Sequence, residues 1–125
     1  MRIVSILLCI ALSVRASPCS ETEKQSWIEN SEFTMVYMDC SRMSFGDAVK
    51  TARCLEKATE LSTDCSLCFG NAAKCGAKKC MLVCLRPDSL KCQECLDTSG
   101  CVEDLMVCVD VASRNDLPPA PEATI

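Results

Sequence analysis

The sequence predicts an all-α protein, a small disulfide-rich helical bundle built on an antiparallel helical hairpin. The first observation is the cysteine content: 13 cysteines occur in 125 residues, and all but one remain once an apolar leader is removed. The second is a turn at Pro87-Asp88 with helix-forming sequence on both sides. The third is that eight cysteines form pairs whose residue numbers sum to 175 or 176, as expected for rungs across a hairpin: Cys84–Cys92, Cys80–Cys95, Cys75–Cys101 and Cys68–Cys108.

Residues 1–16 are expected to be a secretory signal peptide. Met1-Arg2 supplies a positive start, a mostly apolar run extends from Ile3 to Val14, and cleavage is expected after Ala16. The run is too short to be a transmembrane helix, which takes about 20 residues. The protein is therefore expected to be secreted, and because Cys9 is removed with the leader, an even number of cysteines is left for complete pairing.

Charge and aromatic content narrow the choice of partners and the source of stability. Without Arg2 and Arg15, residues 17–125 carry 11 basic and 17 acidic side chains, a net charge of −6. This balance argues against nucleic acid, or an anionic membrane, as the main partner. Three Phe, one Trp and one Tyr give a core little aromatic mass, so crosslinks are expected to supply part of the stability.

Residues 17–43 are interpreted as an N-terminal arm with room for one short helix, because their apolar residues show no clear period. Cys19 and Cys40 bracket the arm and are left over once the other pairs are assigned, so a bridge between them is expected. Large aromatic side chains often anchor binding partners. Three of them are expected to be exposed anchors here: Trp27, Phe33 and Tyr37.

Residues 44–113 are expected to form the disulfide-stapled helical domain. A capping-box pattern begins at Ser44, and apolar residues then recur at helical spacing, which predicts a helix over 45–62. Good helix formers predict a second helix over 65–85. The short turn between these helices is expected to bring one more pair together: Cys54 and Cys65.

Pro87 is expected to end the second helix, because the residue before a proline is pushed out of the α region. A third helix is expected to start near residue 89, and a break at Thr98–Gly100 separates it from a fourth that reaches about Ala112. Residues 114–125 contain a Pro-rich run that cannot continue a helix, so this tail is expected to be extended or disordered.

Two C-x2-C motifs, Cys65–Cys68 and Cys92–Cys95, offer an alternative use of the cysteines. Such a pair of motifs can place four thiolates around one zinc ion, copper(I) suits the same soft ligands, and one motif alone can serve as a redox dithiol. The secretory leader, the eight other cysteines and the absence of histidine favour a structural disulfide framework instead. No metal or other cofactor is expected.

Catalytic groups are scarce. The chain has no histidine, which excludes Ser-His and Cys-His catalysis. The acidic pairs Glu56/Glu60 and Glu103/Asp104 are interpreted as exposed helix surface. The protein is therefore not expected to be an enzyme.

Two further groups of residues have a structural interpretation and a functional one. One group is basic: Lys74, Lys78 and Lys79 form a stripe on the second expected helix, and Arg86 and Lys91 lie near the hairpin tip. These residues are interpreted as a solvated face, or else as a site for a sulfated or phosphorylated partner. Two apolar runs are interpreted as core, or else as the lining of a lipid cavity: Met81–Val83 and Leu105–Val107.

The run from Cys65 to Cys108, with Phe69-Gly70 directly after its first C-x2-C motif, resembles uncharacterised small secreted helical cysteine-rich proteins of microbial eukaryotes. Its inner bridges are also similar to those of plant α-hairpinins, in which two C-x3-C motifs staple a helix pair, although the second motif here is C-x2-C. The resemblance implies a secreted helical fold and no particular activity.

These features predict a secreted cysteine-rich binding protein that acts on an extracellular protein partner. Two alternatives stay open. One is a carrier of a small apolar ligand or lipid, which requires a hollow core. The other is a metal-thiolate protein that holds zinc or copper.

Overall fold

The computed structural model describes residues 17–121, and the expected signal peptide, residues 1–16, lies outside them. Within 17–121 the chain forms six α-helices, two short 3-10 helices and no strand, so the expected all-α fold is confirmed. None of these helices is long and apolar enough to cross a membrane. The elements are α2 (Glu21–Trp27), α3 (Ser31–Met43), α4 (Ala48–Ala58), α5 (Thr63–Cys80), η1 (Val83–Leu85), α6 (Leu90–Thr98), α7 (Cys101–Val109) and η2 (Arg114–Asp116).

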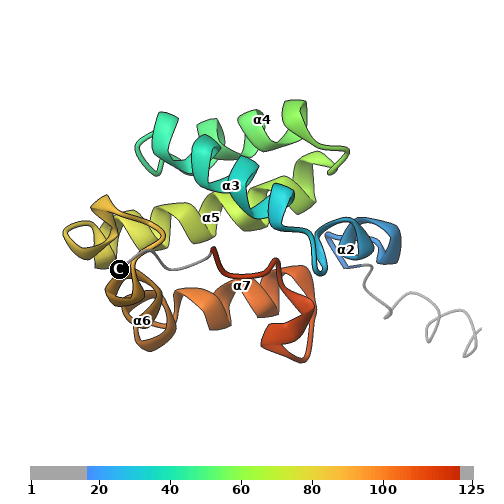
Figure 1. The fold of residues 1–125 in the computed structure, drawn as a ribbon. Coiled ribbons are helices and arrows are strands. Elements are labelled where there is room, and N and C mark those ends of the chain that lie inside the picture. The colour runs from blue at the N-terminus through green and yellow to red at the C-terminus, as the bar shows by residue number, and fades with distance from the viewer. Residues whose placement is uncertain (1–16, 122–125) are drawn as a thin grey trace, which may run out of the picture.

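Helix α5 is the central element of the bundle (Figure 1). Helices α3 and α4 lie on one side of it, α6 and α7 lie on the other, and α2 lies near its N-terminal end. Gly70 allows α4 to approach α5 closely, because a Cβ atom at this position would lie 2.1 Å from the carbonyl oxygen of Ala48. The two sides of α5 therefore carry different packing partners, which matters for the site described below.

Helix α4 is shorter than expected at both ends. The sequence predicts a helix over 45–62 with its cap at Ser44, but Ser44 follows the end of α3 and Asp47 caps α4 instead. Phe45 and Gly46, between the two, both have positive φ. This left-handed turn separates Ser44 from the helix that it was expected to cap.

The second expected helix, over 65–85, is divided in two. Ser62 caps α5, which starts two residues earlier than expected and ends at Cys80. A separate 3-10 turn covers Val83–Leu85, and its middle residue leaves helical geometry. Gly100, with φ of 88°, separates α6 from α7 at the break that the sequence predicts.

The N-terminal arm contains two helices rather than one short helix. Ser20 and Glu23 form a reciprocal capping box at the start of α2, with hydrogen bonds of 3.1 Å and 2.9 Å. The side chain of Asn30 caps α3 by accepting from the Glu32 amide at 3.1 Å. Glu29, between them, has a positive φ of 55°. Because the chain turns at Glu29, no single helical period runs through the arm.

All the cysteines of residues 17–121 are paired in six bridges. Four of the six are the rungs expected from the paired residue numbers, and their Cα atoms are 4.7 to 5.9 Å apart, within the usual range. The break at Gly100 leaves this register unchanged. The confirmed rungs are Cys68–Cys108, Cys75–Cys101, Cys80–Cys95 and Cys84–Cys92.

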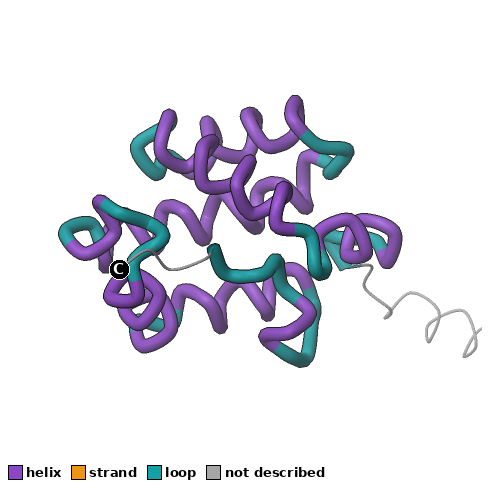
Figure 2. The backbone as a smooth tube through the Cα atoms, viewed as in Figure 1, coloured by secondary structure: helices purple, strands orange, loops and turns teal. Residues whose placement is uncertain are grey.

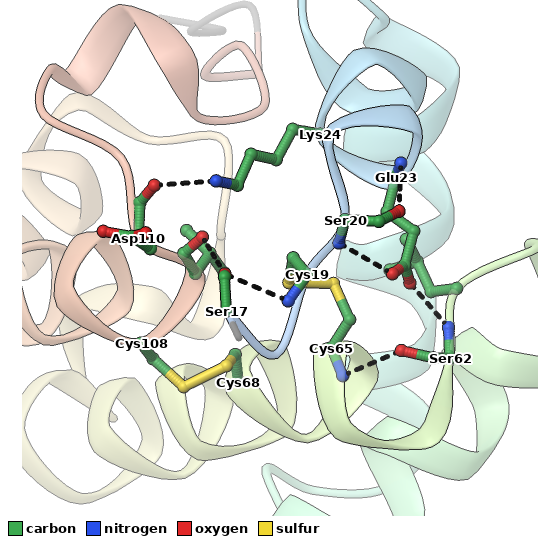
Figure 3. The surroundings of a disulfide bond; sticks show 12 residues. Ser17, Cys19, Ser20, Glu23, Lys24, Ser62, Cys65, Cys68, Cys108 and Asp110 are labelled. Carbon is green, nitrogen blue, oxygen red and sulfur yellow. Dashed lines mark hydrogen bonds between the residues drawn. A yellow bond between two sulfur atoms is a disulfide. The ribbon is translucent and has the colours of Figure 1, made fainter. Parts of the chain in front are cut away.

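The expected pairing of the other four cysteines is wrong. The sequence predicts the pairs Cys19–Cys40 and Cys54–Cys65, whereas the structure joins Cys19 to Cys65 and Cys40 to Cys54. Helices α3 and α4 are consecutive and packed together, so Cys40 near the end of α3 meets Cys54 in α4. Cys19 precedes α2 and lies against the first turn of α5 (Figure 3).

Polar contacts hold the first residues of the described chain beside α7 (Figure 3). Ser17 Oγ donates a hydrogen bond to the Val109 carbonyl oxygen at 3.3 Å. Lys24 Nζ donates to the Asp110 carbonyl oxygen at 2.9 Å. Together with the Cys19–Cys65 bridge, these bonds connect the N-terminal helix to both α5 and α7.

Glu23 connects α2 to the start of α5 (Figure 3). Besides its bond to the Ser20 amide, the carboxylate accepts a hydrogen bond from the Ser62 amide at 2.7 Å. Burial raises the pKa of Glu23, but the hydrogen bonds from Ser20 and Ser62 outweigh it and lower this pKa below its usual value. The ionised carboxylate is thus the form that the fold stabilises.

Candidate functional site

Phe69 is the centre of an aromatic core on the N-terminal half of α5. Its ring centroid lies 5.1 Å from that of Trp27, 5.4 Å from Phe33 and 5.3 Å from Tyr37. Trp27 is fully buried and Phe33 is 4% exposed. The expectation that Trp27, Phe33 and Tyr37 form an exposed binding surface is therefore wrong, because α2 and α3 turn these rings inward onto α5.

Tyr37 lies between this core and a cavity. Its hydroxyl donates a hydrogen bond to the Phe69 carbonyl oxygen at 2.8 Å, and burial raises the pKa of the phenol. The phenol therefore stays neutral and acts as a donor. Its ring packs against Phe69 on one side and contributes to the cavity wall.

The cavity lies alongside the C-terminal half of α5 and has a volume of about 510 Å³. Helices α3, α5, α6 and α7 all contribute to its wall, which is mostly apolar. The wall residues from α5 are small, and this explains why the space is left unfilled. They are Ala72, Ala73, Gly76 and Ala77. Larger apolar residues from α6 and α7 also line the cavity: Leu96, Val102 and Leu105.

The C-terminal segment 117–121 forms another part of the wall. It runs between α3 and α7 as the loop after η2 (Figure 2). Thr34 Oγ1 donates to the Pro119 carbonyl oxygen at 2.6 Å, and Gln93 Nε2 donates to the Pro121 carbonyl oxygen at 3.1 Å. Leu117 is buried. Of the tail expected over 114–125, residues 114–116 thus form η2, residues 117–121 form a loop held by side chains of α3 and α6, and residues 122–125 lie outside the described residues.

The cavity opens to solvent between the α3–α4 turn and the hairpin tip. Phe45, Met81 and Leu85 all line the cavity, yet they are 93%, 63% and 76% exposed. Two arginines also contribute to the wall, and each has an acidic partner: Arg42 pairs with Asp39, and Arg114 pairs with Asp97. The wall is mostly apolar, and the two arginines that contribute to it are already paired.

The apolar runs that the sequence offers as a cavity lining are only partly used. From Met81–Val83 only Met81 lines the cavity, and from Leu105–Val107 only Leu105 does. Val107 is 81% exposed on the outside of α7. The signal missing from the sequence reasoning is the row of small residues on α5, which a helical wheel of residues 72–77 places along one side.

The four cysteines of the two C-x2-C motifs belong to four different bridges. These bridges are Cys65–Cys19, Cys68–Cys108, Cys92–Cys84 and Cys95–Cys80. A metal ion is bound by thiolates, so sulfurs in this oxidised form do not supply the four ligands that a zinc site requires. Nor do residues 17–121 bring three or more carboxylates and cysteines together in another arrangement suited to a metal ion.

No protein-family model matches the chain, and comparisons with curated proteins and with solved structures returned no match. The cavity beside α5 is a geometric feature on which a hypothesis about function can be based. Its volume falls within the roughly 300 to 1,000 Å³ that is typical of small-molecule sites.

Proposed function

We propose that the protein is a secreted carrier that binds one small apolar molecule, such as an acyl chain, in the cavity beside α5. The observation that supports this proposal is a mostly apolar space of about 510 Å³ in a chain of 125 residues. This is the carrier alternative from the sequence. It replaces a role in binding a protein through the aromatic arm, because that arm is part of the core.

The polar groups of the cavity wall support an apolar ligand. The Tyr37 hydroxyl is bonded to the Phe69 carbonyl oxygen, and Thr34 Oγ1 is bonded to the Pro119 carbonyl oxygen. A polar ligand would have to break such bonds or leave its own groups without partners inside the protein, which costs free energy. An apolar ligand leaves the bonds in place and gains from burial.

Two features support secretion and a role in binding. The expected leader over 1–16 directs export, and six disulfides suit an oxidising compartment. The chain has no histidine, which is the commonest general acid or base at neutral pH. A carrier needs a shaped, stable cavity and no reactive group.

Titration with the neutral fluorescent probe N-phenyl-1-naphthylamine tests the proposal. We expect saturable binding to a single site per chain, displaced by a long-chain fatty alcohol. The variant Val102→Phe places a larger side chain into the cavity from α7 and is expected to abolish binding. The matched control is Val107→Phe, the same change on the same helix at a residue that faces solvent, and it is expected to bind as the native protein does.

Two outcomes would contradict the carrier role. One is the absence of saturable probe binding by the native, disulfide-bonded protein. The other is equal binding by the Val102→Phe and Val107→Phe variants, which would locate the probe on the outer surface rather than in the cavity. Intact mass before and after reduction confirms that each variant retains its six bridges.

A further inference from the structure

Five large apolar side chains at the hairpin tip and in the α3–α4 turn are exposed, and we call this group the apolar rim. Three of them also line the cavity: Phe45, Met81 and Leu85. Four of them lie within ten residues at the hairpin tip, at the left of Figure 1, and the fifth lies in the α3–α4 turn. Each is at least 63% exposed. The rim consists of Phe45, Met81, Leu82, Leu85 and Leu90.

Phe45 is placed in solvent by an unfavourable backbone conformation. Its φ of 54° lies in the left-handed region, where glycine and asparagine are favoured over bulky residues. The next residue, Gly46, has no room for a side chain, since a Cβ atom there would lie 2.4 Å from that of Ala77. The fold therefore fixes the turn tightly and presents a phenyl ring that is 93% exposed and gains nothing from the core. Such a ring is typical of a contact surface.

Charge is distributed unevenly between the tip and the rest of the molecule. Residues 74–91 contain five basic side chains and one acidic side chain, Asp88, which gives a net charge of +4. The remainder of residues 17–125 has 6 basic and 16 acidic side chains, a net charge of −10. The total of −6 conceals this separation. Lys78 and Lys79 at the end of α5 and Lys91 at the start of α6 are all exposed beside the apolar rim.

We propose that the apolar rim and its basic surroundings dock the protein onto an anionic lipid surface, with the mouth of the cavity facing the lipid. Apolar side chains surrounded by Lys and Arg are the combination that binds membrane interfaces, because the apolar groups enter the acyl boundary while the cations meet the headgroups. The acidic remainder of the protein is repelled by the same surface, which fixes the orientation. This inference goes beyond the carrier role, since docking does not require a ligand in the cavity.

Co-sedimentation with vesicles tests the apolar half of the proposal. The full disulfide-bonded protein is mixed with vesicles of phosphatidylcholine, alone or with phosphatidylglycerol. We expect strong partition onto the mixed vesicles, weakened by salt. The double variant Leu82→Ser/Leu85→Ser is expected to lose partition on the order of tenfold or more, since each leucine would otherwise leave water. The control Val49→Ser/Val107→Ser changes two exposed apolar residues outside the rim and is expected to bind as the native protein does.

The electrostatic part of the proposal is tested by neutralising three exposed lysines of the basic segment 74–91, as Lys74→Gln/Lys78→Gln/Lys91→Gln. Partition onto the mixed vesicles is expected to fall on the order of 100-fold. The matched control Lys50→Gln/Arg53→Gln/Lys57→Gln removes the same charge from α4, where these residues line a separate surface depression. Both triple variants change the net charge of the protein by the same amount. A larger loss of vesicle partition for the variant in residues 74–91 would therefore show that these lysines act by local contact rather than through net charge.

Three results would overturn the docking proposal: no partition onto mixed vesicles, equal partition onto neutral and mixed vesicles, or tip variants that bind like their controls. The Val102→Phe variant distinguishes a failure of the docking proposal from a failure of the carrier proposal. It is expected to lose the fluorescent probe while binding vesicles as the native protein does, because the rim is unchanged.

Discussion

The two halves of α5 are held in place in different ways. The N-terminal half packs against the aromatic rings of α2 and α3, and Phe69 at its centre is fully buried. The C-terminal half presents small residues to a cavity and has large apolar side chains exposed beyond its end. Three of the four nested bridges are located in this hollow half: Cys75–Cys101, Cys80–Cys95 and Cys84–Cys92.

The difference shows how a short chain can keep a cavity open. An unfilled space forfeits dispersion contacts, so a hollow region is less stable than a packed one. Disulfides compensate by restricting the unfolded chain, which needs no side-chain packing in the folded state. In this protein an aromatic core packs one half of α5, and three bridges crosslink the half that borders the cavity.

The largest expected effect is on the free energy of unfolding, which should fall much more when a side chain is truncated in the packed half than in the half beside the cavity. Phe69→Ala removes the ring at the centre of the aromatic core and is expected to lower the free energy of unfolding by about 3–5 kcal/mol. Val102→Ala removes methyl groups that already face a cavity and is expected to cost about 1 kcal/mol or less. Denaturant unfolding with the disulfides intact measures both. Equal losses would mean that the hollow half is packed as tightly as the other.

The next effect concerns the bridges. Cys19 and Cys65 close 46 residues, so replacing both by Ala is expected to cost about 4 kcal/mol in chain entropy, against about 2.5 kcal/mol for Cys84 and Cys92, which close 8 residues. The effect on local hydrogen exchange is expected to be larger for the shorter bridge. Hydrogen exchange is expected to accelerate in α6 only when Cys84–Cys92 is absent, because little packing is left there. Unchanged exchange in α6 would show that packing, and not the bridge, maintains the tip.

A smaller effect is expected from removing the C-terminal segment by ending the chain at Asp116. The bond from the Trp27 indole nitrogen to the Asp116 carbonyl oxygen is retained, whereas the burial of Leu117 and the bonds of Thr34 and Gln93 are lost. The cavity then gains a second opening. We expect the probe to dissociate on the order of tenfold faster with little change in its association rate. An unchanged dissociation rate would show that this segment does not close the cavity.

The smallest effect is a pH dependence at the packed end. Hydrogen bonds lower the pKa of Glu23 below its ordinary value of 4.5, so its carboxylate stabilises the fold at neutral pH and loses this contribution as the pH falls below 4.5. Glu23→Gln is therefore expected to cost less than about 1 kcal/mol at pH 7. The difference from the native protein should shrink toward zero in acid. Glu60→Gln, at an exposed site, is the control. A difference that grows in acid would reverse the assigned sign.

The hairpin could be predicted from the sequence because one turn sets the register of every rung. Once Pro87 is identified as the turn between two antiparallel segments, each cysteine on one side has a fixed position opposite it on the other. Local information is sufficient for this reasoning. The Gly100 break does not disturb it, since α6 and α7 continue along the same side of α5.

The remaining bridges required information that spacing alone does not contain. Cys40–Cys54 follows the same midpoint rule about Asp47, but only once the arm is known to end in a helix. Cys19–Cys65 joins two cysteines with three helices between them, α2, α3 and α4, so it depends on how α2 is placed against α5. The predicted Cys19–Cys40 bridge is wrong because it assumes that residues 17–43 are crosslinked only within themselves.

The candidate site was harder to predict than the fold, because it depends on what is missing. Ala72, Gly76 and Ala77 are unremarkable in sequence, and only the structure shows that all three line one cavity. The prolines after Leu117 exclude a helix but do not indicate where the segment packs. The basic segment 74–91 also could not be recognised from the net charge of the whole chain, because the acidic residues elsewhere outnumber its basic ones.

The most direct test of the contrast between the two halves is a methyl NMR titration of the native protein with N-phenyl-1-naphthylamine. The methyl groups of Ala72, Ala77 and Val102 line the cavity, and their signals are expected to shift together with a single dissociation constant. Those of Leu55 and Val109, which are fully buried in the packed core, are expected to stay in place. Shifts at Leu55 and Val109, or no shift at the cavity residues, would contradict the account of a filled half and a hollow, ligand-binding half.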